Sequence, residues 1–183
     1  MPKKQLITEK LISIPENVTV DIREGQVQVK GPKGTLSRDF TRLPVMIEKT
    51  STNSLRFSTS FPRTREHAAV GTAAGHVKNM FKGVTEGFMR KMVVLSSHFP
   101  MTVKVQGNNL VIEKLYGQKE NILVPFPKDV KIETKNEEIT ITGIDVEKVG
   151  QIAANIHRAC LWRGKRAKDP TVFMDGIYIT EKS

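Results

Sequence analysis

The sequence contains a single cysteine, Cys160, so an internal disulfide and a metal site built from cysteines alone are excluded. Its longest uninterrupted apolar run, Met92–Leu95, is far short of the roughly 20 residues that span a bilayer, which argues against a membrane-spanning helix. The first residues, Met1–Gln5, lack the apolar stretch and small-residue cleavage site of a secretory signal. We therefore expect a soluble, intracellular protein in a reducing compartment.

Aromatic side chains are also few, with eight Phe, two Tyr and one Trp among 183 residues. Acidic residues are outnumbered, since 29 Lys and Arg against 19 Asp and Glu give a net charge of +10. This excess favours a polyanionic partner, because each neutralised phosphate releases condensed counterions. The excess is uneven: residues 1–91 carry a net charge of +8 and residues 92–183 a net charge of +2.

An internal repeat divides the chain into two similar halves. Alternating apolar residues predict a β-hairpin in each half, with a short glycine-containing turn between its strands. The alternating positions are Val18, Val20, Ile22, Val27 and Val29 in the first half and Val103, Val105, Leu110 and Ile112 in the second. A further strand pair is expected over residues 44–48 and 55–59 and, in the second half, over residues 130–133 and 138–142.

One amphipathic helix is predicted after the strands of each half. The apolar stripes are Val70, Ala73, Ala74, Val77, Met80 and Phe81 and, 79 residues later, Val149, Ile152, Ala153, Ile156, Ala159 and Cys160. Thr64 and Glu66 are expected to start the first helix, and Asp145 to cap the second. The second helix is expected to end near Leu161.

The repeat predicts an α+β fold of two tandem duplicated domains, each an antiparallel β-sheet covered by one α-helix. The domains are expected at residues 1–82 and 83–183. The run Phe88–Phe99, which lies between Gly87 and Pro100, is expected to form the first strand of the second domain. Each domain is small enough for its core to be marginal, so docking or a partner surface is expected to contribute stability.

No arrangement of residues in the sequence supports catalysis. The segment Gly31–Thr35 contains glycines and a lysine but lacks the spacing of a phosphate-binding P-loop, and we interpret it as a hairpin turn. His157 lies three residues before Cys160, but Cys160 belongs to the apolar stripe and His157 is expected to face the helix surface. We therefore predict no enzyme activity, no cofactor and no metal site.

Two groups of basic residues are candidates for RNA binding. The denser group places five positive charges and no acid within eleven residues: Arg158, Arg163, Lys165, Arg166 and Lys168. The helix dipole accounts for one or two cations at a helix end, but not for five, although a solvated basic face remains the alternative. The second group lies before, along and after the first helix and consists of Arg63, Arg65, Lys78, Lys82, Arg90 and Lys91.

Four segments carry a family resemblance: Val29–Leu36, His76–Phe88, His98–Pro100 and Phe173–Ile179. They resemble the L-six family of large-subunit ribosomal proteins, called L-nine in eukaryotes. The last two segments are similar to its eukaryotic and archaeal branch. The last segment, with the sequence FMDGIYI, is similar to the closing signature of that branch. The resemblance extends from about Leu11 to Lys182 and agrees with the internal repeat.

The resemblance implies a structural constituent of the large (60S) subunit that binds large-subunit rRNA near the sarcin–ricin loop, mainly through its second domain. It also implies neighbouring ribosomal proteins, transient proximity to translational GTPases and a ribosomal, cytoplasmic location, with nucleolar passage in a eukaryote. The resemblance implies that the family's RNA-facing segment corresponds to Arg163, Lys165, Arg166, Lys168 and their neighbours up to Asp175 and Gly176. Thr171 stands where eukaryotic members usually carry a basic residue, and Pro170 replaces an aliphatic one.

Three other functions are compatible with the composition. A free-standing tandem RNA-binding regulator would need exposed aromatic residues on its central strands, and Val103–Gln106 and Leu110–Lys114 contain none. An enzyme is disfavoured because no catalytic arrangement is found. A basic protein–protein scaffold is the third alternative, and its associations would be insensitive to nuclease.

Overall fold

The computed structural model describes residues 7–50, 53–161, 169 and 172–182, and these form an α+β fold. The chain divides into two compact units, Met1–Gly87 (unit 1) and Phe88–Ser183 (unit 2). The boundary that the sequence places after Lys82 falls inside helix α1, which extends to Thr85. None of the helices formed by the described residues is long and apolar enough to cross a membrane.

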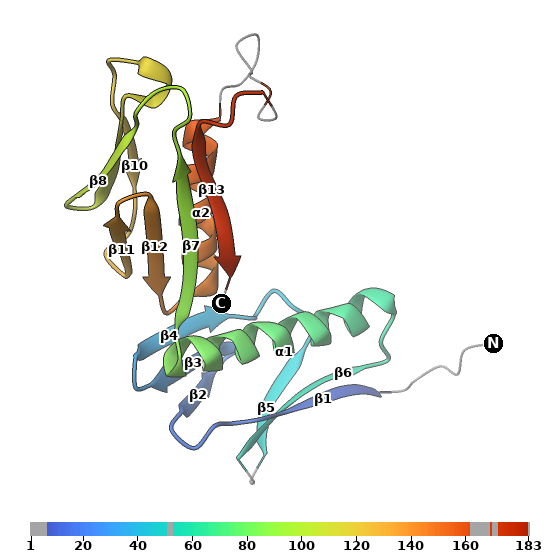
Figure 1. Cartoon of the computed structure of the whole chain (residues 1–183). Coiled ribbons are helices and arrows are strands. Elements are labelled where there is room, and N and C mark those ends of the chain that lie inside the picture. The colour runs from blue at the N-terminus through green and yellow to red at the C-terminus, as the bar shows by residue number, and fades with distance from the viewer. Residues whose placement is uncertain (1–6, 51–52, 162–168, 170–171, 183) are drawn as a thin grey trace. The chain divides into compact units, whose positions relative to one another are not determined.

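Unit 1 contains two three-stranded antiparallel sheets and one helix, α1 (Thr64–Thr85). Its strands are β1 (Ile7–Ser13), β2 (Thr19–Arg23), β3 (Gln26–Gly31), β4 (Gly34–Asp39), β5 (Met46–Thr50) and β6 (Ser54–Ser60). The strand orders are β1-β6-β5 and β2-β3-β4. Helix α1 packs against β1 and β6 of one sheet and β3 and β4 of the other, so one helix covers both (Figure 1).

The apolar alternation of unit 1 produces its core. Val20, Val27 and Val29 are buried, whereas Ile22 is only partly buried. The β2–β3 turn has positive φ at Glu24 (46°) and at Gly25 (82°), which is the backbone twist that two-residue hairpins prefer. All six residues of the first predicted helical stripe are buried.

Helix α1 begins close to the expected position. The main-chain N–H of Arg63 donates to the Glu66 carboxylate over 2.9 Å, which satisfies one of the donors at the helix start. At the other end, the main chain of Gly31 approaches the helix so closely that an added Cβ would lie 2.6 Å from a Val84 methyl. Glycine at position 31 therefore allows β3 to pack against the last turn of α1.

Unit 2 repeats this arrangement with one additional strand. Its strands are β7 (Phe88–Leu95), β8 (Thr102–Gln106), β9 (Asn109–Glu113), β10 (Ile122–Pro125), β11 (Val130–Lys135), β12 (Glu138–Gly143) and β13 (Gly176–Lys182). The strand orders are β10-β9-β8 and β11-β12-β7-β13, and every pair is antiparallel. Helix α2 (Val146–Cys160) packs against β7, β12 and β13. Figure 1 shows the red strand β13 beside the green strand β7.

Helix α2 has the ends that its sequence predicts. The Asp145 side chain accepts a hydrogen bond from the main-chain N–H of Glu147 over 2.9 Å, and the helix ends at Cys160, with Leu161 as its C-cap. Five residues of its apolar stripe are buried, and the sixth, Ala159, is partly buried against the same core.

Three features differ from the expectation. The strand predicted to reach Phe99 ends at Leu95, because the main-chain N–H groups of the next residues turn toward Asp175. Strands β1 and β10 are not anticipated; each lies at the edge of its sheet and carries exposed residues. Val105 is 38% exposed although it belongs to the expected alternation, since β8 is also an edge strand.

Candidate RNA interface

The densest group of predicted RNA-binding residues extends from Arg158 in the last turn of α2 into the connection between α2 and β13. Of this group, Arg163, Lys165, Arg166 and Lys168 lie outside the described residues, as do Trp162, Pro170 and Thr171. The two ends of the connection are described, at Cys160 and at Asp175. The structure therefore describes this site through the contacts made at its two ends.

A tyrosine hydroxyl joins the two ends of the connection. Tyr116 Oη lies 3.1 Å from the Cys160 carbonyl oxygen and 3.0 Å from the Asp175 carbonyl oxygen. The hydroxyl has one proton, so it donates to one carbonyl at a time or shares the bond between both. Burial raises the pKa of the Tyr116 phenol, which keeps the hydroxyl protonated and able to donate.

The Asp175 carboxylate holds a second element next to this point. It accepts hydrogen bonds from the main-chain N–H groups of Ser97 (2.7 Å), His98 (3.1 Å) and Phe99 (3.2 Å), and His98 Nδ1 lies 3.3 Å away. Asp175 is only 3% exposed. Burial alone would raise the pKa of the carboxyl, but these hydrogen bonds outweigh burial and lower it, so the group is an anion at neutral pH.

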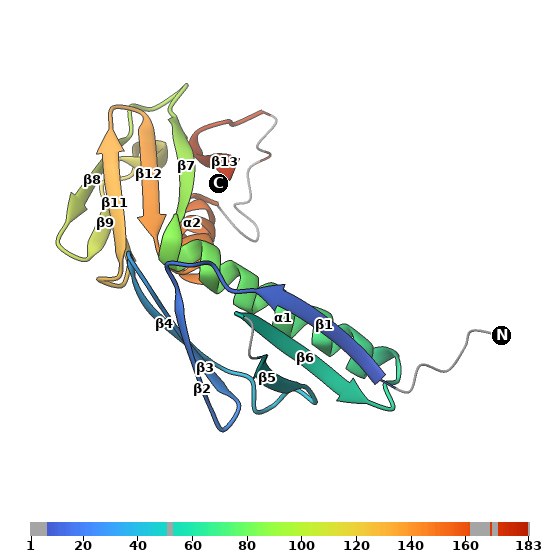
Figure 2. The ribbon, with the colours of Figure 1, turned by 90° about the horizontal axis from the view of Figure 1, so that it is seen from below.

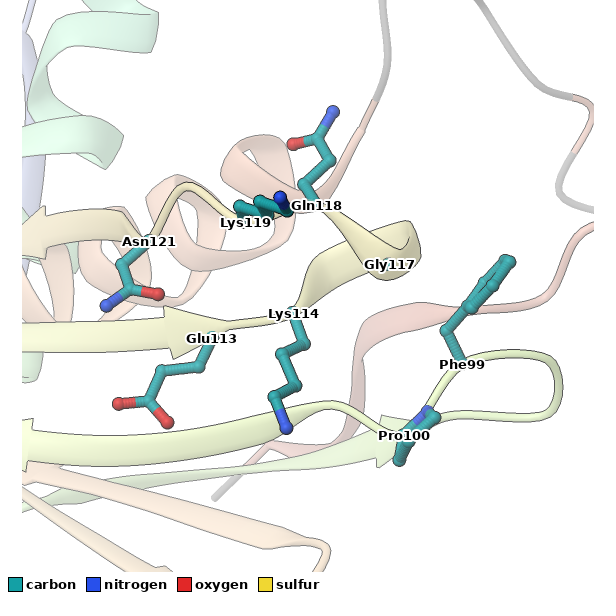
Figure 3. Close-up of a pocket in the computed structure, with 8 residues that line it drawn as sticks. All are labelled: Phe99, Pro100, Glu113, Lys114, Gly117, Gln118, Lys119 and Asn121. Atoms are coloured by element: carbon teal, nitrogen blue, oxygen red, sulfur yellow. The ribbon is translucent and has the colours of Figure 1, made fainter.

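The turn that carries Tyr116 has an unusual backbone. Lys114 and Tyr116 have φ of 60° and 53°, which costs a residue other than glycine roughly 1–2 kcal/mol each. Gly117 follows with φ of 74°, and a Cβ there would lie 3.1 Å from the Phe99 ring. This turn lines an open pocket of about 360 Å³ together with Phe99 and Pro100. Figure 3 shows the Phe99 ring beside Gly117, with Lys114 and Pro100 among the other residues that line the pocket.

The last turn of α2 presents one predicted RNA-binding side chain and buries another polar residue. Arg158 is exposed, and its positive charge near the helix C-terminus also interacts favourably with the helix dipole. His157 is not on the open surface as expected: it is partly buried, and its Nδ1 donates to the Ile177 carbonyl of β13 over 2.8 Å. The unpredicted contact arises because β13 covers that side of the helix.

Cys160 is a core residue, as its place on the apolar stripe indicates. It is 2% exposed, and burial raises the pKa of its thiol to about 12, partly opposed by a hydrogen bond with the Ile177 main chain. The thiolate that a nucleophile or a metal ligand requires is therefore not populated at neutral pH. Among the described residues, no three His, Cys, Asp or Glu side chains are grouped as a metal site requires.

Two basic residues on β7 are held by contacts inside unit 2. Lys91 forms an ion pair with Glu181 of β13 at 2.8 Å, and this hydrogen bond raises the pKa of Lys91. The guanidinium of Arg90 lies over α2, 3.3 Å from where a Cβ at Gly150 would stand. Lys91 is thus already paired with an acid, which weakens its prediction as an RNA contact.

The basic residues of unit 1 separate into two places along α1. Arg63 and Arg65 are exposed at its first turn, where the positive end of the helix dipole disfavours cations, so helix stability does not explain them. Lys78 and Lys82 lie about 20–28 Å away near the other end, given 1.5 Å of rise per residue. There they line a groove of about 510 Å³ together with Lys10 of β1. The predicted group is therefore not one surface.

Sequence reasoning missed the residues that organise the end of unit 2. Tyr116 and Asp175 are single polar residues in apolar surroundings, and no periodic pattern marks them. Asp175 has one usable signal, because it is the only acid within the closing segment Phe173–Ile179. A lone acid in an otherwise apolar strand start needs hydrogen-bond donors, and the Ser97–Phe99 main chain supplies them.

Comparison with known proteins gives a consistent result. The family described as "Ribosomal protein L6" matches residues 14–87 and 99–176. A "Large ribosomal subunit protein uL6" of Aeropyrum pernix is 40% identical over 182 residues, covering 100% of this chain and 98% of the relative. The proteins of the same name from Methanobrevibacter smithii and Methanosphaera stadtmanae are 43% and 42% identical, covering 93% and 100% of this chain and 94% and 97% of theirs.

One matched range lies in each half of the chain, and each falls within one unit of the fold. The identities extend over nearly the full length of the relatives, so the similarity is not confined to a single shared segment. The chain therefore belongs to the ribosomal protein L6 family, whose members are structural proteins of the large ribosomal subunit and not enzymes.

Proposed function

We propose that this protein is built into the large ribosomal subunit by binding rRNA, and that unit 2 makes the principal contact through the connection between α2 and β13. The contact consists of Arg158, Arg163, Lys165, Arg166 and Lys168. These side chains neutralise phosphates and set the orientation of the protein, because folded RNA is recognised largely by shape and backbone. Arg63 and Arg65 of unit 1 form a smaller, second contact.

The proposal rests on the combination of a dense positive charge in this connection with a hydrogen-bonded residue at each of its ends. Five cations without an acid occupy eleven residues from Arg158 to Lys168. The carbonyls at the two ends, Cys160 and Asp175, both meet the Tyr116 hydroxyl. Ends that are fixed before binding reduce the conformational entropy that the segment loses when it meets a ligand.

The family resemblance supports a finer location for the contact. Members of this family are expected near the sarcin–ricin loop, where translational GTPases act transiently. We extend this location to the present chain, with neighbouring ribosomal proteins as further partners and cytoplasmic translation as the process. The relatives compared above are archaeal, so the proposal is made for a large subunit of that type; a 60S subunit and a nucleolar step apply only in a eukaryote.

Salt dependence of binding to a large-subunit rRNA fragment tests the contact. When the fragment carries only the site for unit 2, its five phosphate contacts should make log K fall against log salt with a slope of about −3.5 to −4.5. The triple variant Arg163→Ala, Lys165→Ala and Arg166→Ala should reduce the steepness of this slope. It should also be incorporated less into large subunits, as measured by sedimentation in high salt.

The matched control is the triple variant Lys128→Ala, Lys131→Ala and Lys135→Ala, which removes the same charge from exposed positions on or next to β11. It should retain normal incorporation. Normal assembly and an unchanged slope in the first variant would show that the contact lies elsewhere.

A further inference from the structure

The two units differ at one sheet edge. In unit 2, β7 is paired on both sides, with β12 and with β13. In unit 1, β1 pairs with β6 on one side and, among the described residues, with no strand on the other. Figure 2 shows β1 at the edge of its sheet, running alongside α1.

The registers establish that β1 and β7 are equivalent. Lys10 and Ile12 of β1 lie opposite the buried Phe57 and Leu55 of β6. In the same way, Arg90 and Met92 of β7 lie opposite the buried Ile141 and Ile139 of β12. Lys10 therefore corresponds to Arg90 and Ile12 to Met92. The unpaired edge of β1 is the edge that β13 occupies in unit 2.

The helices extend this equivalence to the groove beside β1. The 79-residue offset between the helical stripes relates Lys78 to His157 and Phe81 to Cys160. In unit 2 both of these side chains contact the main chain of Ile177 in β13. In unit 1, Lys78 and Phe81 line the groove of about 510 Å³ between β1 and α1. The groove thus lies where unit 2 holds a strand.

The lining of the groove combines apolar and basic groups. Leu11, Ile12 and Phe81 provide apolar surface, and Leu11 is 62% exposed. Lys10, Lys78 and Lys82 provide three exposed cations, with Glu86 at one end. An unpaired strand edge also presents carbonyl groups, which repel phosphate but accept hydrogen bonds from a peptide.

We propose that this groove binds an extended, acidic peptide strand of a neighbouring protein, which pairs antiparallel with β1 as β13 pairs with β7. Apolar residues of the strand lie opposite Ile12 and Ile14, the counterparts of Met92 and Val94, and acidic residues meet Lys10, Lys78 and Lys82. The proposal goes beyond rRNA binding and assigns Lys78 and Lys82 to a protein contact. A second copy of this chain is a poorer occupant, because it brings the same lysines.

Peptide binding to the full-length protein tests the proposal. The acidic probe is a synthetic peptide that copies Gly176–Lys182 with Thr180→Glu and Lys182→Glu. The basic probe copies the same segment with Thr180→Lys and Glu181→Lys. The acidic peptide should shift and protect main-chain amides of Lys10–Ser13 in NMR spectra, and the basic peptide should bind at least about fivefold more weakly.

Charge reversal supplies the second arm. Lys10→Glu with Lys78→Glu should invert the preference between the two peptides, and both lysines are exposed, so the fold should be unaffected. The matched control is Lys30→Glu with Lys49→Glu, at exposed positions on β3 and β5 outside the groove, which should keep the wild-type preference.

Three outcomes would overturn the proposal. The first is that neither peptide protects the β1 amides. The second is that a single-stranded RNA fragment perturbs the same amides and displaces the acidic peptide, which would return Lys78 and Lys82 to an RNA contact. The third is concentration-dependent protection of β1 without any peptide, which would identify a second copy of the chain as the occupant.

Discussion

Unit 1 and unit 2 share one fold and differ in whether another described strand pairs with the outer edge of their first strand. Strand β13 covers β7 in unit 2, and unit 1 has no counterpart among its described strands. The connection that leads into β13 is also the segment with the dense positive charge, Arg158–Lys168. The additional strand β13 and the proposed rRNA contact therefore belong to one segment that is added to the duplicated fold in unit 2. In unit 1, the edge of β1 has no partner among the described strands.

The charges of the two units show the same difference. Residues 1–91 carry a net charge of +8, yet the predicted RNA-binding cations of unit 1 are divided between the two ends of the 22-residue helix α1. Residues 92–183 carry only +2, and five of their cations lie within the eleven residues from Arg158 to Lys168. Affinity for phosphates depends on how many contacts form together, so local density is a better guide to an RNA contact than the net charge of a unit.

Removing a core side chain should have the largest effect and should act on one unit. Phe57 and Ile141 occupy equivalent positions on β6 and β12, and both have 0% exposure. Phe57→Ala should cost about 3–5 kcal/mol and Ile141→Ala about 2–5 kcal/mol. Amide hydrogen exchange should show the greater loss of protection in unit 1 for the first variant and in unit 2 for the second. Equal losses in both units would contradict the division into two cores.

Adding a methyl group where strand and helix meet should have the next largest effect. A Cβ at Gly31 would lie 2.8 Å from Val84 Cβ and 2.9 Å from its carbonyl oxygen, whereas a Cβ at Gly143 would meet mainly one methyl of Val149, at 2.7 Å. Gly31→Ala should therefore destabilise by about 3 kcal/mol and Gly143→Ala by about 1–2 kcal/mol. Urea unfolding of both variants gives the comparison, and a reversed order would show that α1 yields more easily than α2.

The Asp175 carboxylate tests a contact that belongs to unit 2. Asp175→Asn should destabilise by about 2 kcal/mol at neutral pH, because a buried acceptor of three main-chain N–H groups is weakened. Since folding lowers the pKa of this carboxyl, its contribution is complete above the ordinary value of about 3.9 and is lost as pH falls through the lowered value. Urea midpoints of wild type and variant should converge below that value, and a constant difference would assign the effect to packing.

The smallest effect is expected at two equivalent helical glycines. A Cβ at Gly71 of α1 meets nothing within 4 Å, so Gly71→Ala should stabilise unit 1 by about 0.5–1 kcal/mol. At Gly150 of α2, the guanidinium of Arg90 lies 3.3 Å from the added atom and has to move. Gly150→Ala should therefore stabilise less. Thermal unfolding measures both changes, and an equal gain would mean that Arg90 moves without cost.

Periodicity predicted the elements that bury a regular face. The stripe from Val70 to Phe81 and its repeat from Val149 to Cys160 produced both helices, and the cap at Asp145 followed from local chemistry. Strands β1 and β10 gave no such signal. They lie at sheet edges, where hydrogen bonding to a neighbour defines the strand more than burial does, and β10 has only four residues.

The site was predictable where it depends on charge along the sequence and not where it depends on tertiary contacts. The basic residues lie close together in the sequence and can be found there directly. The contacts of Tyr116 with Cys160 and Asp175 join residues that are 44 and 59 positions apart. The pairing of Lys91 with Glu181 and the contact of His157 with β13 also require the sheet to form. The prediction that His157 faces the surface was wrong for this reason.

The most direct test of the different roles of the two units is the salt dependence of rRNA-fragment binding in two charge-matched variants. One is Arg163→Ala, Lys165→Ala and Arg166→Ala in unit 2, and the other is Lys10→Ala, Lys78→Ala and Lys82→Ala in unit 1. In the first variant, two of the five unit 2 contacts are left, so the slope of log K against log salt should become less steep and reach about −1.4 to −1.8. In the second variant, the slope should stay near the wild-type value. Equal reductions in both variants, or a reduction only in the second, would contradict the assignment of the principal RNA contact to unit 2.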